Sequence, residues 1–283
     1  MRPVHYISLA SAIALIALLY WGGNTIPPAK ESTKPAMAGM PPGASMVQPA
    51  SFDSILTASK LRLAKSAAEE IKNIENELTA SHDSSGMAVV FTRLAHVWEQ
   101  NKFLPVAAYY GAKGAKLENS EKKLNFAGQF FLDLMNDSSV SESVRMWEAK
   151  EAVDCFTRSK DINPDNDTTK VKLATAYIDG TNETMQGVQL LLGITREKPD
   201  NLLANLMLGR LAVKSGQFDK AIKRLEGLLE KYPDNTEAIY FLAEAYKGKG
   251  DKVKAVELFE KCKKIVNKPE FSKEIDDYIN SFK

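Results

Sequence analysis

The sequence predicts an all-α protein built from stacked helical hairpins, and three observations lead to this fold class. Pro199 and Pro233 stand 34 residues apart, with small and bulky apolar residues at matching offsets around them. A repeat of this length is typical of helical hairpins packed side by side. The chain also lacks the alternating β-branched stretches that predict a sheet. Its 283 residues, 44% of them hydrophobic, are enough to form a substantial core.

The best-defined repeat unit runs from 202 to 235. Its seventh, eighth, twentieth, twenty-fourth and thirty-second positions hold Leu208, Gly209, Ala221, Leu225 and Pro233. Small residues at the eighth and twentieth positions let two antiparallel helices approach closely, while large residues fill the space between hairpins. The proline ends the second helix. In the turn between the paired helices, Lys214-Ser-Gly-Gln-Phe provides a glycine for a left-handed cap, and Lys247-Gly-Lys-Gly-Asp does so in the next unit. This pattern resembles the tetratricopeptide repeat (TPR) family.

Similar units flank this one on both sides. The unit 236–269 carries Leu242, Ala243, Tyr246, Ala255 and Phe259, with Pro269 two places late. The unit 168–201 keeps Ala174, Leu191 and Pro199 but has Gly187 where alanine is expected. Upstream, 88–121 places Leu94, Ala95, Trp98 and Ala107 at the expected offsets. The segment 121–166 fits at both ends, with Ala127, Gly128 and Phe131 in its first half and Ala152, Phe156 and Pro164 in its second. Surplus residues lie between the halves, at 136–147, and end in an exposed-looking Met146-Trp147.

The resemblance covers 88–269, about five units, and implies a right-handed superhelix whose concave face is lined mainly by the first helix of each hairpin. TPR domains that hold peptides use the second, fifth, ninth and twelfth positions of these helices. Here those positions include His96, Asn125, Gln129, Lys172, Arg210, Tyr240 and Glu244. The family's clamp for a terminal carboxylate is not reproduced, because Ala176 and Leu206 stand at two of its positions. We therefore predict a mixed groove anchored by Lys172, Arg210 and Tyr240; the alternative is an ordinary solvated helix surface.

The N-terminus differs from the repeats. An apolar stretch from Tyr6 to Trp21, interrupted only by two serines, predicts a membrane segment. It is short for a bilayer span and also matches the core of a cleaved signal peptide, but no suitable cleavage site follows closely. We expect residues 1–21 to form a retained single-pass anchor in an inner (cytoplasmic) membrane. The short leading segment favours a periplasmic, extracytoplasmic location for the repeats.

A linker and further helices complete the predicted organisation. Residues 22–50 are rich in Pro, Gly and Ala and predict a flexible tether. From 51 to 80 an apolar stripe predicts one amphipathic helix with Asp53 as a candidate cap. It either packs on the first repeat or forms a homodimer seam through 52–78. At the other end, residues 270–283 predict a helix that covers the last repeat.

No arrangement of residues for catalysis, cofactor binding or metal binding is apparent in the sequence. Cys155 and Cys262 are predicted to be buried apolar residues in different units. The three histidines are scattered, and 161–167 lacks the glycine and distal glutamate of a calcium loop. The net charge of +1 gives no reason to expect nucleic-acid binding.

The sequence therefore predicts a non-enzymatic, membrane-tethered adaptor that binds a protein or peptide partner in the cell envelope. Complex assembly and cytochrome c maturation are candidate settings, on architecture alone. The alternatives are a self-associating structural envelope protein and an adaptor that faces the cytoplasm.

Overall fold

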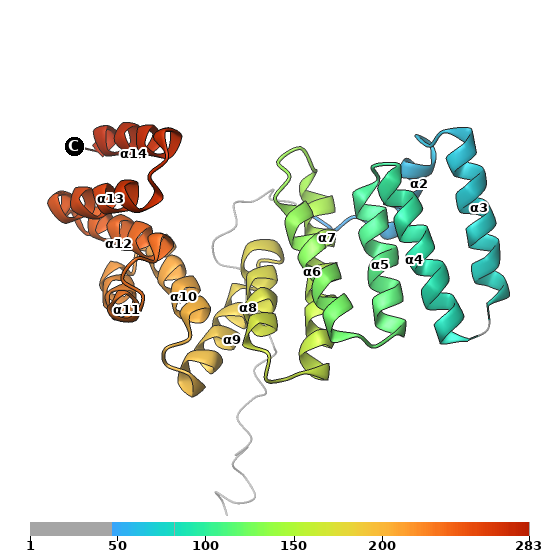
Figure 1. The fold of residues 1–283 in the computed structure, drawn as a ribbon, viewed down its shortest axis with the longest axis horizontal. Helices are drawn as coiled ribbons and strands as arrows, with labels where there is room; N and C mark the ends of the chain where they lie inside the picture. The colour runs from blue at the N-terminus through green and yellow to red at the C-terminus, as the bar shows by residue number, and fades with distance from the viewer. Residues whose placement is uncertain (1–46, 82, 283) are drawn as a thin grey trace, which may run out of the picture. The chain divides into compact units, whose positions relative to one another are not determined.

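The computed structural model describes residues 47–81 and 83–282, which belong to the second of two compact units in the chain. The predicted membrane segment at 6–21 and most of the predicted linker lie outside these residues. All regular structure in the described part is helical (Figure 1). The helices are α2 (Phe52–Lys60), α3 (Lys65–Ala80), α4 (Ser84–Gln100), α5 (Leu104–Leu117), α6 (Glu121–Met135), α7 (Glu142–Ile162), α8 (Asp167–Thr175), η1 (Ala176–Gly180), α9 (Thr184–Glu197), α10 (Leu202–Lys214), α11 (Phe218–Lys231), α12 (Thr236–Lys249), α13 (Lys252–Val266) and α14 (Pro269–Phe282).

The helices pair as hairpins, as predicted. Paired helices pack extensively within each hairpin, α4 with α5, α6 with α7, α10 with α11 and α12 with α13, while α9 packs on α8 and η1. Neighbouring hairpins also pack together, as α11 does on α12. Buried apolar clusters lie within and between these hairpins. Within residues 47–81 and 83–282, no helix has both the length and the apolarity needed to cross a bilayer.

The last three hairpins begin with the same helix cap. The side chains of Asn166, Asn201 and Asn235 accept hydrogen bonds from backbone N–H groups three residues later, at 3.1, 3.0 and 2.8 Å. These contacts cap α8, α10 and α12, whose first N–H groups have no partner within the helix. One capping asparagine therefore begins each of the last three hairpins.

Glycines provide left-handed turns between paired helices and allow close approach where helices cross. Gly216 and Gly250 have φ angles of +71° and +91°, so both adopt the left-handed conformation at the turn between paired helices. At the crossing of α10 and α11, a Cβ on Gly209 would lie 2.6 Å from Leu225 Cδ2. A Cβ on Gly187 would lie 2.7 Å from the carbonyl oxygen of Ala174. The glycine that departs from the family pattern is therefore required by a closer approach of α9 to α8.

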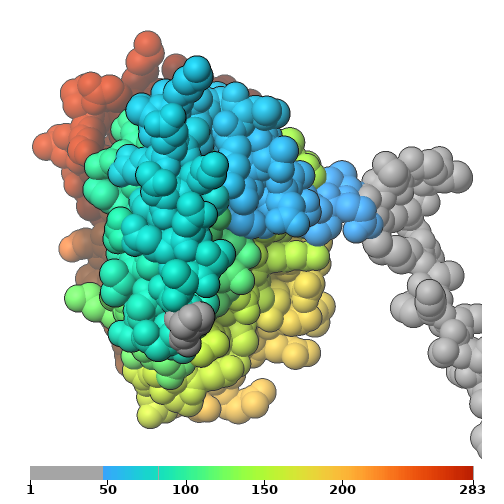
Figure 2. Space-filling model, turned by 90° about the vertical axis from the view of Figure 1, so that its right-hand side faces the viewer, coloured from blue at the N-terminus to red at the C-terminus, as the bar shows by residue number. Residues whose placement is uncertain are grey.

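The predicted single helix at 51–80 is wrong in its continuity, because the chain forms α2 and α3 with a turn between them. Phe52 on α2 stacks on Tyr109 of α5, whereas Ile71 and Ile74 on α3 are buried against α4. The turn lets the two helices reach different partners. Figure 2 faces this end of the described region and shows α2 and α3 on its surface. Ser51, not Asp53, is the cap, since its side chain accepts the N–H of Ser54.

The predicted exposure of Trp147 is also wrong. Residues 142–147 form the first turns of α7, and only 6% of Trp147 is exposed. Its indole packs edge-on against Phe131, at 5.6 Å between ring centroids, and stacks near Phe52 at 6.1 Å. The N–H of Ala50 donates to the carbonyl oxygen of Ser143. The surplus residues thus extend α7 and give α2 a surface on which to pack.

The C-terminal helix α14 packs against α13, as predicted for 270–283. Ile275 and Ile279 are buried beside Phe259, and Phe271 and Tyr278 are partly buried in the same cluster. Cys155 and Cys262 are both buried and unpaired, which confirms their assignment as core residues. Burial raises the pKa of the Cys155 thiol to about 12, so it remains protonated at physiological pH.

Candidate functional site

The residues predicted to form a partner groove lie on the first helix of successive hairpins. They are His96 on α4, Asn125 and Gln129 on α6, Lys172 on α8, Arg210 on α10, and Tyr240 and Glu244 on α12. We call the side of these five helices that carries them the A-helix face. All seven side chains are at least partly exposed, and no hydrogen bond or ion pair joins any two of them. The structure does not gather them into one cluster, and their role in binding stays a prediction.

One of the seven, His96, lines a hollow of about 440 Å³ where α4, α5 and α6 meet. The hollow exists because most of the residues beneath it are small. Its floor and walls include Ala95, Ala107, Ala108, Gly111, Ala115 and Ala127. We call it the α4–α6 hollow.

Two phenylalanines of α6 form the apolar wall of this hollow. Phe126 is 74% exposed, and its ring centroid lies 6.5 Å from that of the partly buried Phe130. The charged residue Lys123 at the rim is paired with Glu118 at 2.5 Å, and His96 Nε2 lies 2.9 Å from Gln100 Nε2. The hollow is mainly apolar, and its polar lining residues are Thr92, His96, Glu99 and Lys123.

The polar residues predicted on α6 are engaged within the protein. Asn125 Oδ1 accepts a hydrogen bond from Thr169 Oγ1 at 2.9 Å, which links α6 to α8. Gln129 Nε2 donates to Asp133 Oδ1 at 2.8 Å on the same helix. These amides stabilise the fold and would have to exchange partners in order to bind another protein.

Arg210 also has an internal partner. Its Nη2 donates to Asp179 Oδ2 at 2.7 Å. Asp179 lies in the π-helical turn η1, which the sequence pattern does not predict. Gly180 permits this turn, because a Cβ there would lie 2.4 Å from Ala149. Lys172, by contrast, has no hydrogen bond or ion pair within the described residues, and so it is the unpaired cation of the predicted groove.

The predicted residues of α12 belong to an aromatic and charged cluster. The Tyr240 ring packs edge-on against Phe259, at 5.4 Å between centroids, and burial raises the pKa of its hydroxyl. Lys247 Nζ donates to Glu244 Oε2 at 3.3 Å and lies 4.2 Å from the centroid of the Tyr278 ring. The Glu244 carboxylate is therefore balanced by a cation of its own helix.

Sequence reasoning missed Phe126 and Phe130. Both were passed over because the family's groove positions fall on their neighbours Asn125 and Gln129. A signal was present, since Phe126 lies off the buried stripe formed by Leu124, Ala127 and Phe131. A large apolar residue outside the core stripe of an amphipathic helix is a candidate for contact with a partner.

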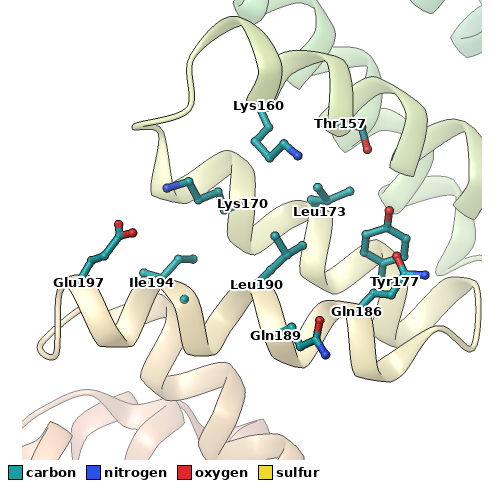
Figure 3. A pocket seen from close by; sticks show the side chains of 11 residues that line it. Thr157, Lys160, Lys170, Leu173, Tyr177, Gln186, Gln189, Leu190, Ile194 and Glu197 are labelled. Atoms are coloured by element: carbon teal, nitrogen blue, oxygen red, sulfur yellow. The ribbon is translucent and has the colours of Figure 1, made fainter.

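A larger hollow, of about 580 Å³, lies between α7, α8 and α9 (Figure 3). The figure shows Lys160, Lys170 and Leu190 approaching it from the three helices. Both lysines are near acids, with Lys160 Nζ 3.5 Å from Asp161 and Lys170 Nζ 3.6 Å from Asp167. The two lysines of this hollow therefore have acidic partners, and Glu197 also lines it.

The comparison with protein families agrees with the repeat assignment for the last two hairpins. Residues 206–266 match the tetratricopeptide repeat family model. Among solved structures, the chain is similar to YrrB, described as a TPR protein with an unusual peptide-binding site, at 18% identity over 67% of this chain and 92% of that one, with a TM-score of 0.44. It is similar to MamA at 18% identity over 62% and 95%, with a TM-score of 0.47. It is also similar to a tetratricopeptide repeat protein of Parabacteroides merdae at 13% identity over 81% and 92%, with a TM-score of 0.49. The family match falls on α10 to α13, so the resemblance to tetratricopeptide repeats rests on these two hairpins.

Proposed function

We propose that this protein is a non-enzymatic scaffold that binds a segment of another protein on its A-helix face and is tethered to a membrane by its N-terminus. Helical repeats of this kind present long surfaces that suit the binding of an extended or helical peptide. The repeat match at 206–266 supports a role in protein interaction. The apolar sequence from Tyr6 to Trp21 supports the tether.

The observation that carries the binding proposal is the α4–α6 hollow. Phe126 stands 74% exposed at the hollow. Val89 on α4 is 58% exposed and lies two helical turns before His96, on the same side of that helix. Exposed apolar groups of this size beside a concave surface mark sites of protein contact. An aliphatic or aromatic side chain of the partner, placed between Phe126 and His96, would remove the phenylalanine from water.

The binding proposal is tested by crosslinking the full-length protein in native membranes and identifying what co-purifies. We expect one or more partners to be lost when Phe126→Ser removes the apolar wall. Leu61→Ser is the matched control, because Leu61 is 84% exposed and lies in the turn between α2 and α3. A triple alanine variant of Lys172, Arg210 and Tyr240 tests whether the polar part of the face contributes. Partners that are unchanged in both variants would place binding elsewhere.

Tethering and orientation need separate measurements. A membrane anchor predicts that the protein stays in the pellet after alkaline carbonate extraction, and that removal of residues 1–21 releases it. If the repeats are extracytoplasmic, protease added to spheroplasts will cleave the 22–50 region. Protection of that region would favour an adaptor that faces the cytoplasm.

Self-association is the second candidate, and the described residues limit where its seam can be. Ile71 and Ile74, the centre of the stripe predicted at 52–78, are 1% and 3% exposed because α4 covers them. A dimer through this stripe would have to displace α4. Sedimentation of the protein in detergent tests the idea, since a monomer at all concentrations would exclude it.

A further inference from the structure

A second concave surface lies along α11, beside α9 and α10. Two hollows, of about 510 and 470 Å³, follow each other along α11, and Lys220 and Arg224 line both. The first is also lined by α9 and by Leu208 and Ala212 of α10. Each of these residues is two positions from Arg210, which places it about 200° around the helix. We call the two hollows together the α9–α11 groove.

The first hollow is an apolar cleft with unusually exposed side chains. Met185 and Leu192 on α9 are 68% and 41% exposed, and Leu208 and Leu211 of α10 line the same hollow. Isolated apolar residues on a surface need no explanation, but several around one concavity indicate a place where an apolar group is bound. The cleft has room for aliphatic side chains.

Arg224, which lines both hollows, is oriented without an acidic partner. Its Nη1 donates to Asn205 Oδ1 at 2.6 Å. Asn205 is itself 8% exposed and fixed, because its Nδ2 donates to the carbonyl oxygens of Pro199 and Asn201 at 2.7 and 3.0 Å. Burial lowers the pKa of the Arg224 guanidinium, and no neighbouring acid offsets this effect. A guanidinium carries five N–H donors, so most of those on Arg224 are available to a ligand.

Three of the other four cations of the groove, Lys214, Lys220 and Lys223, also lack an acidic partner among the described residues. Lys220 Nζ donates to the neutral Gln217 Oε1 at 2.7 Å. Lys214 and Lys223 have no hydrogen bond or ion pair within the described part of the chain. The one ion pair at the groove joins Lys231 to Asp200 at its far end. Two acids of α11 contact α12 instead, since Asp219 pairs with Lys249 and Glu226 accepts from Tyr246.

This group of unpaired cations differs from the lysines of the hollow in Figure 3 and from Arg210, although Lys172 on the A-helix face is also unpaired among the described residues. The lysines of the hollow in Figure 3 lie near Asp161 and Asp167, and Arg210 is paired with Asp179. The Arg224 guanidinium is oriented by a neutral amide and lies beside an apolar cleft. Such a site suits a carboxylate in a peptide whose adjacent side chains are apolar.

We propose that the α9–α11 groove binds a peptide segment of a protein partner in which an aspartate or glutamate adjoins aliphatic residues. The carboxylate accepts hydrogen bonds from Arg224 and Lys220. The aliphatic side chains enter the cleft between Met185 and Leu211. The two hollows of this groove share no lining residue with the α4–α6 hollow, so the protein can hold a partner at each place and the two proposals fail independently.

The test is a selection from a random twelve-residue peptide library displayed on phage, with full-length protein in detergent micelles as the target. Each recovered peptide is synthesised with a fluorescent label, and its dissociation constant is measured by anisotropy. We expect a class of peptides that Arg224→Gln weakens at least tenfold, and each of them should carry an acidic residue beside aliphatic ones. Arg196→Gln is the matched control, because Arg196 is exposed on α9 and lines neither hollow.

Met185→Glu gives a second test that does not depend on Arg224. Because the Met185 side chain is mostly exposed, its replacement leaves the core intact, while the added carboxylate repels an acidic peptide. The same class should lose affinity in this variant and keep it in Arg210→Gln and Phe126→Ser. The proposal is overturned if no recovered peptide distinguishes Arg224→Gln from wild type, or if the sensitive peptides lack acidic residues. Should thermal unfolding show that Arg224→Gln does not fold, unchanged binding to Met185→Glu overturns it.

Discussion

The hairpins α4–α7 and the hairpins α10–α13 are both antiparallel helix pairs, but their cores are built differently. In α10–α13 the core is mainly aliphatic, with small residues facing large ones, as where Gly209 meets Leu225, and Phe259 is the one buried aromatic side chain of these four helices. In α4–α7 the core is aromatic, with Trp98, Phe131 and Phe156 fully buried and Trp147 nearly so. The helix α2, which lies outside the repeat, packs on this aromatic core through Phe52. The comparison shows that the helix lengthened by the surplus residues, α7, packs on an added element, α2, whereas α10 and α11 pack mainly on neighbouring hairpin helices.

The largest effect should come from removing the aromatic residue that joins α7 to α2. Trp147→Ala deletes the ring that contacts Phe52 and Phe131, and it should lower the free energy of unfolding by about 3 to 5 kcal/mol. Chemical denaturation followed by circular dichroism measures this loss. Phe126→Ala is the control and should change stability by less than about 0.5 kcal/mol, because its side chain is exposed. Equal losses in the two variants would contradict the account of the aromatic core.

The aromatic region should also respond to pH, through Glu148. This residue of α7 is fully buried and neither carboxylate oxygen has a hydrogen-bond partner. Burial, and next the charge of Asp137, raise its pKa from 4.5 to about 7, against the opposing effect of Arg145. The folded state thus binds the proton more tightly than the unfolded chain does. The stabilisation of the folded state by protonated Glu148 is fully present below pH 4.5, declines as pH rises towards 7 and is lost above that.

We expect this loss to be about 2 kcal/mol between pH 5 and pH 8, since residual solvent and Arg145 screen the charge. Glu148→Met removes the titrating group at similar volume. The difference in unfolding free energy between wild type and this variant, measured by urea titration at several pH values, should therefore grow with pH in favour of the variant. A difference that stays constant would show that Glu148 is not the responsible group.

The regular hairpins should instead be sensitive to single methyl groups at the helix crossing. Gly209→Ala places a Cβ 2.6 Å from Leu225 and should cost about 1 to 2 kcal/mol. Gly227→Ala, on α11, meets nothing within 4 Å and should stabilise the helix by about 0.5 to 1 kcal/mol. Thermal unfolding of the two variants shows directly whether each substitution stabilises or destabilises the protein. Stabilisation by both substitutions would mean that α10 and α11 are not in close contact at Gly209.

The smallest effect should be the loss of one helix cap. Asn235→Ala removes the side chain that accepts the N–H of Ala238 and should cost about 1 kcal/mol. Asn235→Asp retains an acceptor and should cost less. Hydrogen exchange of the first turn of α12 checks whether the loss is local. Protection that is the same in the alanine variant and wild type would contradict the capping role.

How far the fold could be predicted from sequence follows from the same comparison. The hairpins from 168 to 266 were recognisable because small residues, turn glycines and prolines recur at fixed offsets. The division of 51–80 into α2 and α3 was not, because its cause is tertiary: Phe52 and Ile71 have partners on different helices. Trp147 appeared exposed for the same reason, since the helix that covers it comes from a different part of the sequence.

The candidate site was less predictable than the fold. Family positions identified His96 at the α4–α6 hollow, but they passed over Phe126 beside it. The family positions also could not show that Arg210 forms an ion pair with Asp179, because the π-helical turn that positions this acid depends on the packing of Gly180. In the α9–α11 groove, Arg224 is distinguished by having no acidic partner within the described residues. The sequence could not predict this, because Asp219 and Glu226 on the same helix contact α12 instead.

The most direct test of the central claim is photocrosslinking from the A-helix face in native membranes. A photoreactive amino acid replaces Phe126 in one variant and Leu61 in another, since both positions are exposed on the described surface. We predict a discrete crosslinked product of higher mass from position 126 and none from position 61. The same products from both positions, or none from position 126, would contradict the claim that this face binds a protein partner.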